Sequence, residues 1–278
     1  MKRNLTAAAL ALLLVLGLSA CGGNDAGEAI VKAQEAMADV QSMTYQTVME
    51  MDLSAEGSSV SMSVSADVSA IVDPLALEMA MSLDMGELGT LDYTSYMVSG
   101  DDALTMYSCL DMGDGPTWIR EDVTDMTSLS QYDAKASLDL YLKSAQSFRE
   151  VGAETVGDYE AVRYDGVIKG DDLDEVLETS GVLEQLSNLG IEESADLLTD
   201  IGDLPISIWI DQATSFPVKY EMDMSALMQT MLGKMAETDE SVSGVTVDKL
   251  IVSMVVTGVD CVDEIVVPEE ALTATSEG

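Results

Sequence analysis

The sequence predicts an α+β protein in which helices pack on the apolar face of one large antiparallel sheet. Two observations predict this class. Between Tyr45 and Met85, apolar and polar residues alternate with a period of two, as in strands with one buried and one hydrated face. Helical spacing appears before these runs and returns between later strands. The expected order is a helix, many strands, helices, two strands, helices and further strands.

The first element is expected to be a helix over Glu28–Val40, with Asp25 as its N-cap. The apolar residues that recur at helical spacing are Ala29, Ile30, Ala33, Ala36, Met37 and Val40. This spacing gives the helix one apolar side, which must pack against the sheet.

Three long strands are expected next, over residues 45–55, 60–70 and 75–85. In the middle run, Val60, Met62 and Val64 alternate with serines. Further strands are expected at Leu91–Ser99, Ala103–Leu110, Thr117–Asp122, Ala153–Val156, Ala161–Ile168, Leu204–Ile210, Pro217–Met224, Val245–Thr257 and Cys261–Val267. Further helices are expected at Leu129–Phe148, Asp171–Leu189, Glu192–Leu198 and Ala226–Ala236.

The N-terminus has the layout of a secretory signal peptide. Lys2 and Arg3 are followed by an uncharged apolar run over residues 7–16 and then by small residues. This run is shorter than the roughly 20 residues that a membrane-spanning helix needs. Leu18-Ser19-Ala20-Cys21 resembles the bacterial lipobox, which implies cleavage before Cys21 and attachment of acyl chains such as palmitate to it. The alternative is an ordinary signal peptide that a cysteine happens to follow.

These features predict four parts of the chain. They are a signal peptide (1–20), a lipidated cysteine with a flexible tether (21–27), a single folded domain (28–267) and a polar tail (268–278) that frays from Ala271. Two acyl chains on one residue hold a protein stably on a membrane. We therefore expect the protein on the extracytoplasmic face of the cell membrane, held by its N-terminal lipid.

The composition excludes several classes of function. The chain has 51 acidic and 12 basic residues, no histidine and a net charge of −39, which argues against binding to nucleic acid. The lack of histidine removes the commonest general base and zinc ligand. We expect no catalytic residues, no metal site and no cofactor, and therefore no enzyme. The apolar fraction of 47% is too high for a disordered acidic chain.

Two cysteines remain after Cys21, namely Cys109 and Cys261. In an exported protein an even pair is compatible with a disulfide. Two free thiols that act as small apolar groups are the other interpretation. The sequence leaves both open.

Residues 209–219, with the sequence WIDQATSFPVK, resemble a strand–turn–strand of the LolA/LppX-type lipoproteins. Tyr159–Ile168 is similar to the strand that those proteins place before their middle helices, and the helix that leads into Met43-Thr44-Tyr45 also fits. The resemblance extends over roughly residues 28–267. It implies a strongly curved half-barrel whose concave apolar face is covered by helices, with space for acyl chains or other apolar molecules between the two layers.

Methionines are frequent on the apolar side of the expected strands, at Met49, Met51, Met62, Met79, Met81, Met85, Met222 and Met224. Methionine is flexible and polarizable, so a cavity lined by it suits apolar ligands of varied shape. The other interpretation is an ordinary core in which methionine fills gaps. We therefore expect an anchored lipoprotein that binds a lipid or other hydrophobic ligand. The alternative is an acidic module with a filled core that docks or senses an envelope protein.

Overall fold

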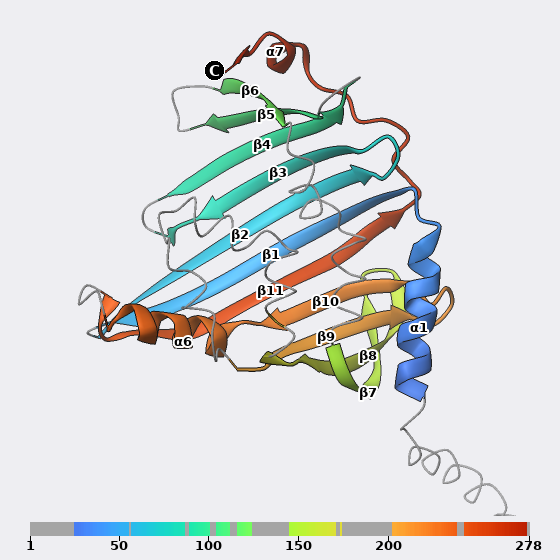
Figure 1. Ribbon diagram of the computed structural model, residues 1–278, viewed down its shortest axis with the longest axis vertical. Helices are drawn as coiled ribbons and strands as arrows, with labels where there is room; N and C mark the ends of the chain where they lie inside the picture. The colour runs from blue at the N-terminus through green and yellow to red at the C-terminus, as the bar shows by residue number, and fades with distance from the viewer. Residues whose placement is uncertain are drawn as a thin grey trace, which may run out of the picture.

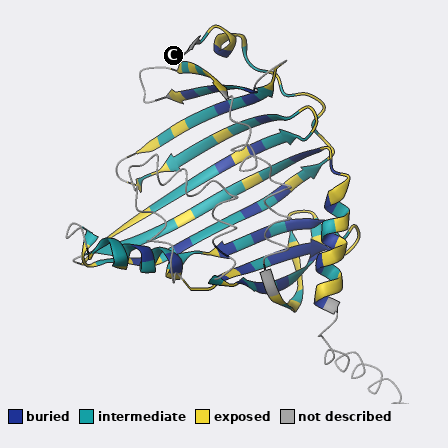
Figure 2. Cartoon of the chain, viewed as in Figure 1, coloured by how far each residue is buried: buried dark blue, intermediate teal, exposed yellow. Residues whose placement is uncertain are grey.

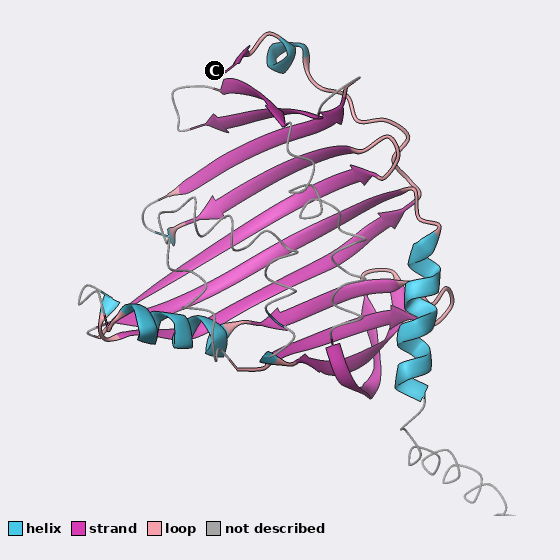
Figure 3. Ribbon diagram, viewed as in Figure 1, coloured by secondary structure: helices cyan, strands magenta, loops and turns pink. Residues whose placement is uncertain are grey.

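The computed structural model describes residues 25–55, 57–86, 89–100, 104–111, 116–123, 145–170, 173, 202–237 and 242–276. One 12-stranded sheet dominates the fold, and helices α1 and α6 lie in front of it (Figures 1 and 3). The helices are α1 (Asp25–Ala38), α6 (Ser225–Met235) and α7 (Glu269–Leu272). The strands are β1 (Ser42–Ala55), β2 (Ser58–Ile71), β3 (Ala76–Asp84), β4 (Thr90–Ser99), β5 (Leu104–Asp111), β6 (Thr117–Val123), β7 (Ala145–Val156), β8 (Tyr159–Ile168), β9 (Leu204–Asp211), β10 (Pro217–Asp223), β11 (Val245–Val259) and β12 (Thr275–Ser276).

The sheet is built from two runs of antiparallel neighbours that meet at β1 and β11. Its order is β12-β6-β5-β4-β3-β2-β1-β11-β10-β9-β8-β7, and every pair is antiparallel except β12 with β6. Two bulges interrupt the pairing of β1 with β11, and bulges bend the strand that carries them. The curved sheet with helices on one face confirms the fold class that the sequence predicted.

The register gives the sheet two chemically different faces. We define the inner face as the one that carries Met49, whose partners are Val64 on β2 and Val252 on β11. The alternate positions, beginning with Glu50, form the outer face. From β5 across to β9, the described inner-face positions include no charged side chain. A slip of one residue would turn each apolar set to the opposite face, so this pattern fixes the register.

Two clusters of buried side chains cover the inner face unequally. The larger lies where Ile30, Ala33 and Met37 of α1 pack over β8, β9, β10 and β11. The smaller joins β2, β3, β4 and β5 through Ala66, Val68, Leu77, Met97 and Leu104. Tyr45 on β1 packs against both clusters. Figure 2 shows the result, with more buried residues near α1 and a largely half-buried centre.

The N-terminal boundary of the domain differs from the expectation. α1 begins at Asp25, so residues 25–27 are helical rather than part of a tether. Ala26 is only 4% exposed and belongs to the larger cluster. Burial of this side chain against the sheet extends the helix one turn earlier than spacing from Glu28 indicated.

The C-terminal expectations are wrong in two places. Residues 261–267 are not a strand, because β11 ends at Val259 and Asp260 turns the chain with φ of 48°. The Asp260 carboxylate accepts hydrogen bonds from the backbone N–H groups of Gln41 and Ser42, at 2.8 and 3.3 Å. The tail does not fray at Ala271, which is fully buried in α7, and β12 then pairs with β6 at the sheet edge.

The middle helices fall largely outside the described residues. Within the range predicted as a helix over Leu129–Phe148, residues 145–148 belong to β7 instead. The rest of that range and the range Glu192–Leu198 lie outside the described residues. Of Asp171–Leu189, only Leu173 is described, and it is a fully buried helical residue of the larger cluster.

We predict that Gly166→Ala destabilises the protein. A Cβ at this inner-face position of β8 would lie 2.7 Å from two ring carbons of Phe148. Forcing a methyl group into a filled site typically costs about 1–3 kcal/mol, measurable by urea unfolding. Gly233→Ala in α6 is the control, because nothing lies within 4 Å of its Cβ position. That change should stabilise by up to about 1 kcal/mol. Equal stability of Gly166→Ala and wild type would contradict the packing.

Candidate ligand-binding face

Five of the candidate methionines lie on the inner face of three neighbouring strands. Met49 and Met51 lie on β1, Met62 on β2, and Met79 and Met81 on β3. Met51 stands directly opposite Met62. Met49 is the next inner position of β1, and Met79 and Met81 occupy inner positions of β3. Directly opposed side chains in a sheet have Cβ atoms about 5 Å apart. We call these five residues the methionine face.

The methionine face is half-buried, whereas its neighbours near α1 are closed. Ile208 on β9 and Val218 beside it on β10 are fully buried. All five residues of the methionine face are intermediate in exposure. On the same inner face, Val60 is 50% and Leu110 40% exposed. An uncharged surface that is neither filled nor fully exposed can receive an apolar chain at little cost in desolvation of polar groups.

The other predicted methionines lie elsewhere. Met85 follows β3 in a turn, where its N–H donates to the carbonyl of Gly89 at 3.0 Å. Met222 on β10 is buried in the larger cluster, and Met224 packs against that cluster just before α6. Sequence reasoning missed Met97, Met106 and Met254, which share the inner face on β4, β5 and β11. The alternation of apolar and polar residues within the predicted strands was the signal that could have identified these three methionines.

Cys109 and Cys261 do not form a disulfide. Cys109 is buried on β5, and Cys261 is exposed just after β11. Strands β4, β3, β2 and β1 separate β5 from β11, which at about 4.8 Å per step amounts to roughly 24 Å. A disulfide needs Cα atoms within about 7 Å. The interpretation as a buried free thiol therefore holds for Cys109 but not for Cys261, which is exposed.

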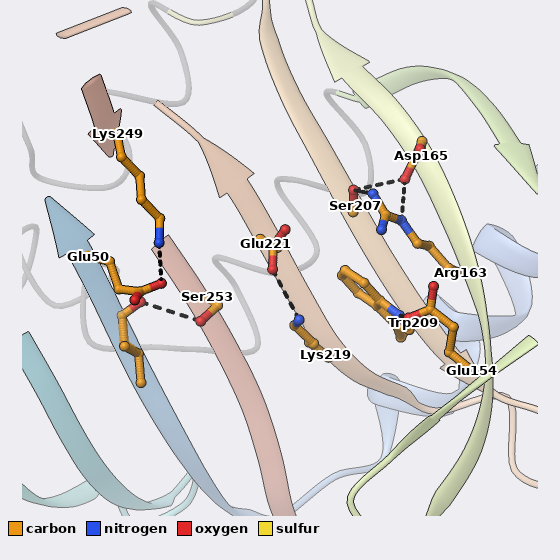
Figure 4. Close-up of polar contacts among 11 residues, drawn as sticks. Glu50, Glu154, Arg163, Asp165, Ser207, Trp209, Lys219, Glu221, Lys249 and Ser253 are labelled. Atoms are coloured by element: carbon orange, nitrogen blue, oxygen red, sulfur yellow. Dashed lines mark hydrogen bonds and ion pairs between the residues drawn. The ribbon is translucent and has the colours of Figure 1, made fainter. Parts of the chain in front are cut away.

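Trp209 of the WID motif points away from the ligand face. It lies on the outer face between its cross-strand partners Arg163 and Lys219 (Figure 4). The Arg163 guanidinium carbon is 5.0 Å and the Lys219 ammonium 4.2 Å from the ring centroid. The indole N–H donates to Glu154 of β7 at 2.7 Å, which brings β7 over the ring. Trp209 is therefore 2% exposed without lining the inner face.

Ion pairs and hydrogen bonds between side chains connect neighbouring strands on the outer face. Arg163 and Ser207 both donate to the same oxygen of Asp165, at 2.7 and 2.8 Å. Partial burial raises the pKa of Asp165, but these two hydrogen bonds outweigh it and hold the pKa below its ordinary value. Lys249 pairs with Glu50 at 2.9 Å across β11 and β1 (Figure 4). These ion pairs and hydrogen bonds stabilise the sheet, and the acidic side chains remain in contact with water.

The turn after the WID motif is held by its own side chains. One carboxylate oxygen of Asp211, Oδ2, accepts from the N–H of Thr214 at 2.9 Å and from its hydroxyl at 2.7 Å. The hydroxyl of Thr214 in turn accepts from the N–H of Phe216 at 3.2 Å. Ser215 adopts φ of 62°, which lets the chain reverse into β10. The motif thus encodes a tight β9–β10 hairpin.

The described residues contain no group of three or more His, Cys, Asp or Glu side chains that could hold a metal ion. Among the described helices, none combines the length and apolar character needed to cross a membrane.

A sequence profile for a family of unknown function, DUF6612, matches residues 25–276. This chain belongs to the DUF6612 family. The match spans α1 to β12, so the family domain includes both the methionine face and the C-terminal segment. A comparison with curated proteins gives no match.

Solved structures show which fold this DUF6612 protein shares. LprF from Mycobacterium bovis is 13% identical with a TM-score of 0.50, over 90% of this chain and 99% of that one. LppX from Mycobacterium tuberculosis is 12% identical with a TM-score of 0.46, over 87% and 99%. A lipoprotein-sorting domain from Vibrio parahaemolyticus is 10% identical, with a TM-score of 0.23 over 85% and 92%. The likeness to LprF shows that the two chains share a fold, which agrees with the curved sheet that the motifs implied.

We predict that Trp209→Phe lowers the free energy of unfolding by about 1–2 kcal/mol, because the hydrogen bond from the indole to a carboxylate is lost. Trp118→Phe is the matched control, since the buried Nε1 of Trp118 has no hydrogen-bond partner in the described part of the chain. Its effect should stay below about 1 kcal/mol, because no such bond is broken. Chemical denaturation of both variants measures the difference. Equal losses would show that the bond to Glu154 contributes nothing.

Proposed function

We propose that this protein is a membrane-anchored extracytoplasmic lipoprotein that binds a lipid or other hydrophobic ligand between its sheet and its helices. The observation that carries the proposal is the inner face, which has no charged side chain among its described positions from β5 to β9 and is half-buried at the methionine face. It is a binding function and requires no catalytic group.

Burial of an acyl chain supplies the driving force. Each methylene group removed from water contributes about 0.8 kcal/mol, so ten would contribute about 8 kcal/mol before the costs of association. Thioether side chains change rotamers readily and adapt to irregular partners. The methionine face therefore suits a class of apolar chains rather than one rigid molecule.

Anchoring is the second part of the proposal and rests on the lipobox. Only Gly22, Gly23 and Asn24 separate Cys21 from the start of α1. Four fully extended residues span at most about 14 Å, which would keep the folded body close to the membrane. Ligand transfer to or from that membrane would need little movement.

We predict that Cys21→Ser abolishes lipid attachment and releases the protein into the soluble fraction. Metabolic labelling with a palmitate analogue, followed by membrane fractionation, measures both effects. Cys261→Ser is the matched control, because its exposed thiol lies outside the lipobox. Labelled, membrane-bound Cys21→Ser protein would rule out the proposed anchor.

A second candidate is an acidic interaction module, which the net charge of −39 favours. Its affinity for a basic envelope partner would fall steeply as salt increases, whereas burial of an acyl chain would not.

The ligand proposal predicts that Met62→Glu weakens binding of a fluorescent fatty acid at least tenfold, because a carboxylate would have to lose water beneath the chain. Ser65→Glu is the matched control. It adds the same charge to the outer face of the same strand, between Val48 and Ser82. Fluorescence titration measures the two affinities, and unfolding curves confirm that both variants fold. Equal affinities would place the probe elsewhere.

Native mass spectrometry of the mature protein from its own host's envelope identifies the ligand. A stoichiometric lipid or other apolar adduct would support the proposal. A bare mass, together with no binding of the fatty-acid probe, would exclude it and favour the acidic interaction module.

A further inference from the structure

A cavity lies between α1 and the β9–β10 hairpin, at the end of the inner face that α1 covers and away from the methionine face. Its volume is about 440 Å³, within the range of small-molecule sites. Ala29, Val162 and Ile210 provide its apolar surface. The polar residues that line it are Glu28, Lys32, Tyr164, Asp211, Gln212 and Ser215.

The wall of this cleft formed by the β9–β10 hairpin is held in place without a ligand. Thr214 ties down one oxygen of Asp211, and the N–H of Gln212 donates to the carbonyl of Glu160 at 3.0 Å. On the opposite wall, Lys32 and Glu28 are paired at 2.7 Å on successive turns of α1. Binding would therefore require little ordering of the protein, which favours affinity for a small molecule.

Asp211 is the unusual group in the cleft. It is 5% exposed, and within the described residues the hydrogen bonds that its carboxylate accepts are the two from Thr214. No described Lys or Arg forms an ion pair with it. Buried carboxylates are normally paired with a cation or bound to a metal. Since Glu28 and Lys32 offset each other, Asp211 leaves the cleft with one uncompensated negative charge.

We propose that this cleft binds a primary ammonium group attached to a short apolar chain. The ammonium would donate to Asp211, and the chain would lie against Ala29, Val162 and Ile210. A net charge of −39 concentrates cations around the protein and repels anions, in the same direction as the local charge. The ammonium belongs either to a free amine or to an aminolipid headgroup.

The first test is calorimetry of the mature protein with hexylammonium, hexanol and hexanoate, which share one chain length. Saturable binding of hexylammonium alone is expected. Asp211→Asn keeps an oxygen for the Thr214 bonds but removes the charge, and should weaken binding roughly tenfold. Asp158→Asn, in the exposed β7–β8 turn, is the matched control and should bind like wild type. Unchanged binding by Asp211→Asn, or equal binding of all three probes, would overturn the assignment.

A second variant tests the site without altering its charge. Ala29→Trp fills the cleft and should abolish binding, whereas Val31→Trp places the same side chain at a position of α1 that is 52% exposed. Both variants should keep the thermal stability expected of a folded domain. If Ala29→Trp folds and still binds hexylammonium with wild-type affinity, the cleft is not the site.

Vesicles distinguish the two sources of the ammonium. The Cys21→Ser protein is mixed with vesicles of either phosphatidylethanolamine or phosphatidylcholine. The nitrogen of phosphatidylcholine is trimethylated and has no N–H to donate. Binding to the first only, reduced by Asp211→Asn, would support an aminolipid headgroup. Binding of hexylammonium without vesicle binding would support a free amine. No binding to either would refute the proposal.

Discussion

The inner face of the sheet has to be kept from water over the width of eight strands, and the rest of the fold follows from this constraint. From β5 to β9 its described positions include no charged side chain, so little on that face favours hydration. The β8–β11 end meets the constraint by packing under α1. The middle of the sheet, at the methionine face, is only partly kept from water. A protein with this division is suited to complete its core with a bound apolar molecule.

The outer face, in contrast, has to accommodate a large negative charge. Some of its acids pair with basic residues, as Glu50 does with Lys249 and Asp165 with Arg163. Trp209 contributes to stability from this side, because two cations and a carboxylate surround its ring. Strong acidity and strong apolar character coexist in this chain because period-two alternation assigns them to different faces of one sheet.

Helix α1 contacts both the apolar larger cluster and the charged cleft. Ile30, Ala33 and Met37 close the larger cluster, while Glu28 and Lys32 on its other side line the cleft beside Asp211. A change in the position of this helix would therefore alter both the covered inner face and the cleft. Its start at Asp25, four residues after Cys21, also places it next to the proposed anchor.

The sequence by itself determined the fold class, most of the strands and the face on which their side chains lie, because alternation and helical spacing are local properties of the chain. It therefore placed Met49, Met51, Met62, Met79 and Met81 on one face of adjacent strands. Only the tertiary structure decided that Cys109 and Cys261 lie apart, since this depends on the order of strands between β5 and β11. It likewise placed Glu154 of β7 against the Trp209 indole and paired the C-terminal strand β12 with β6. The charge on buried Asp211 emerged only when α1 and a distant hairpin met, because no local pattern encodes a contact between segments so far apart in the chain.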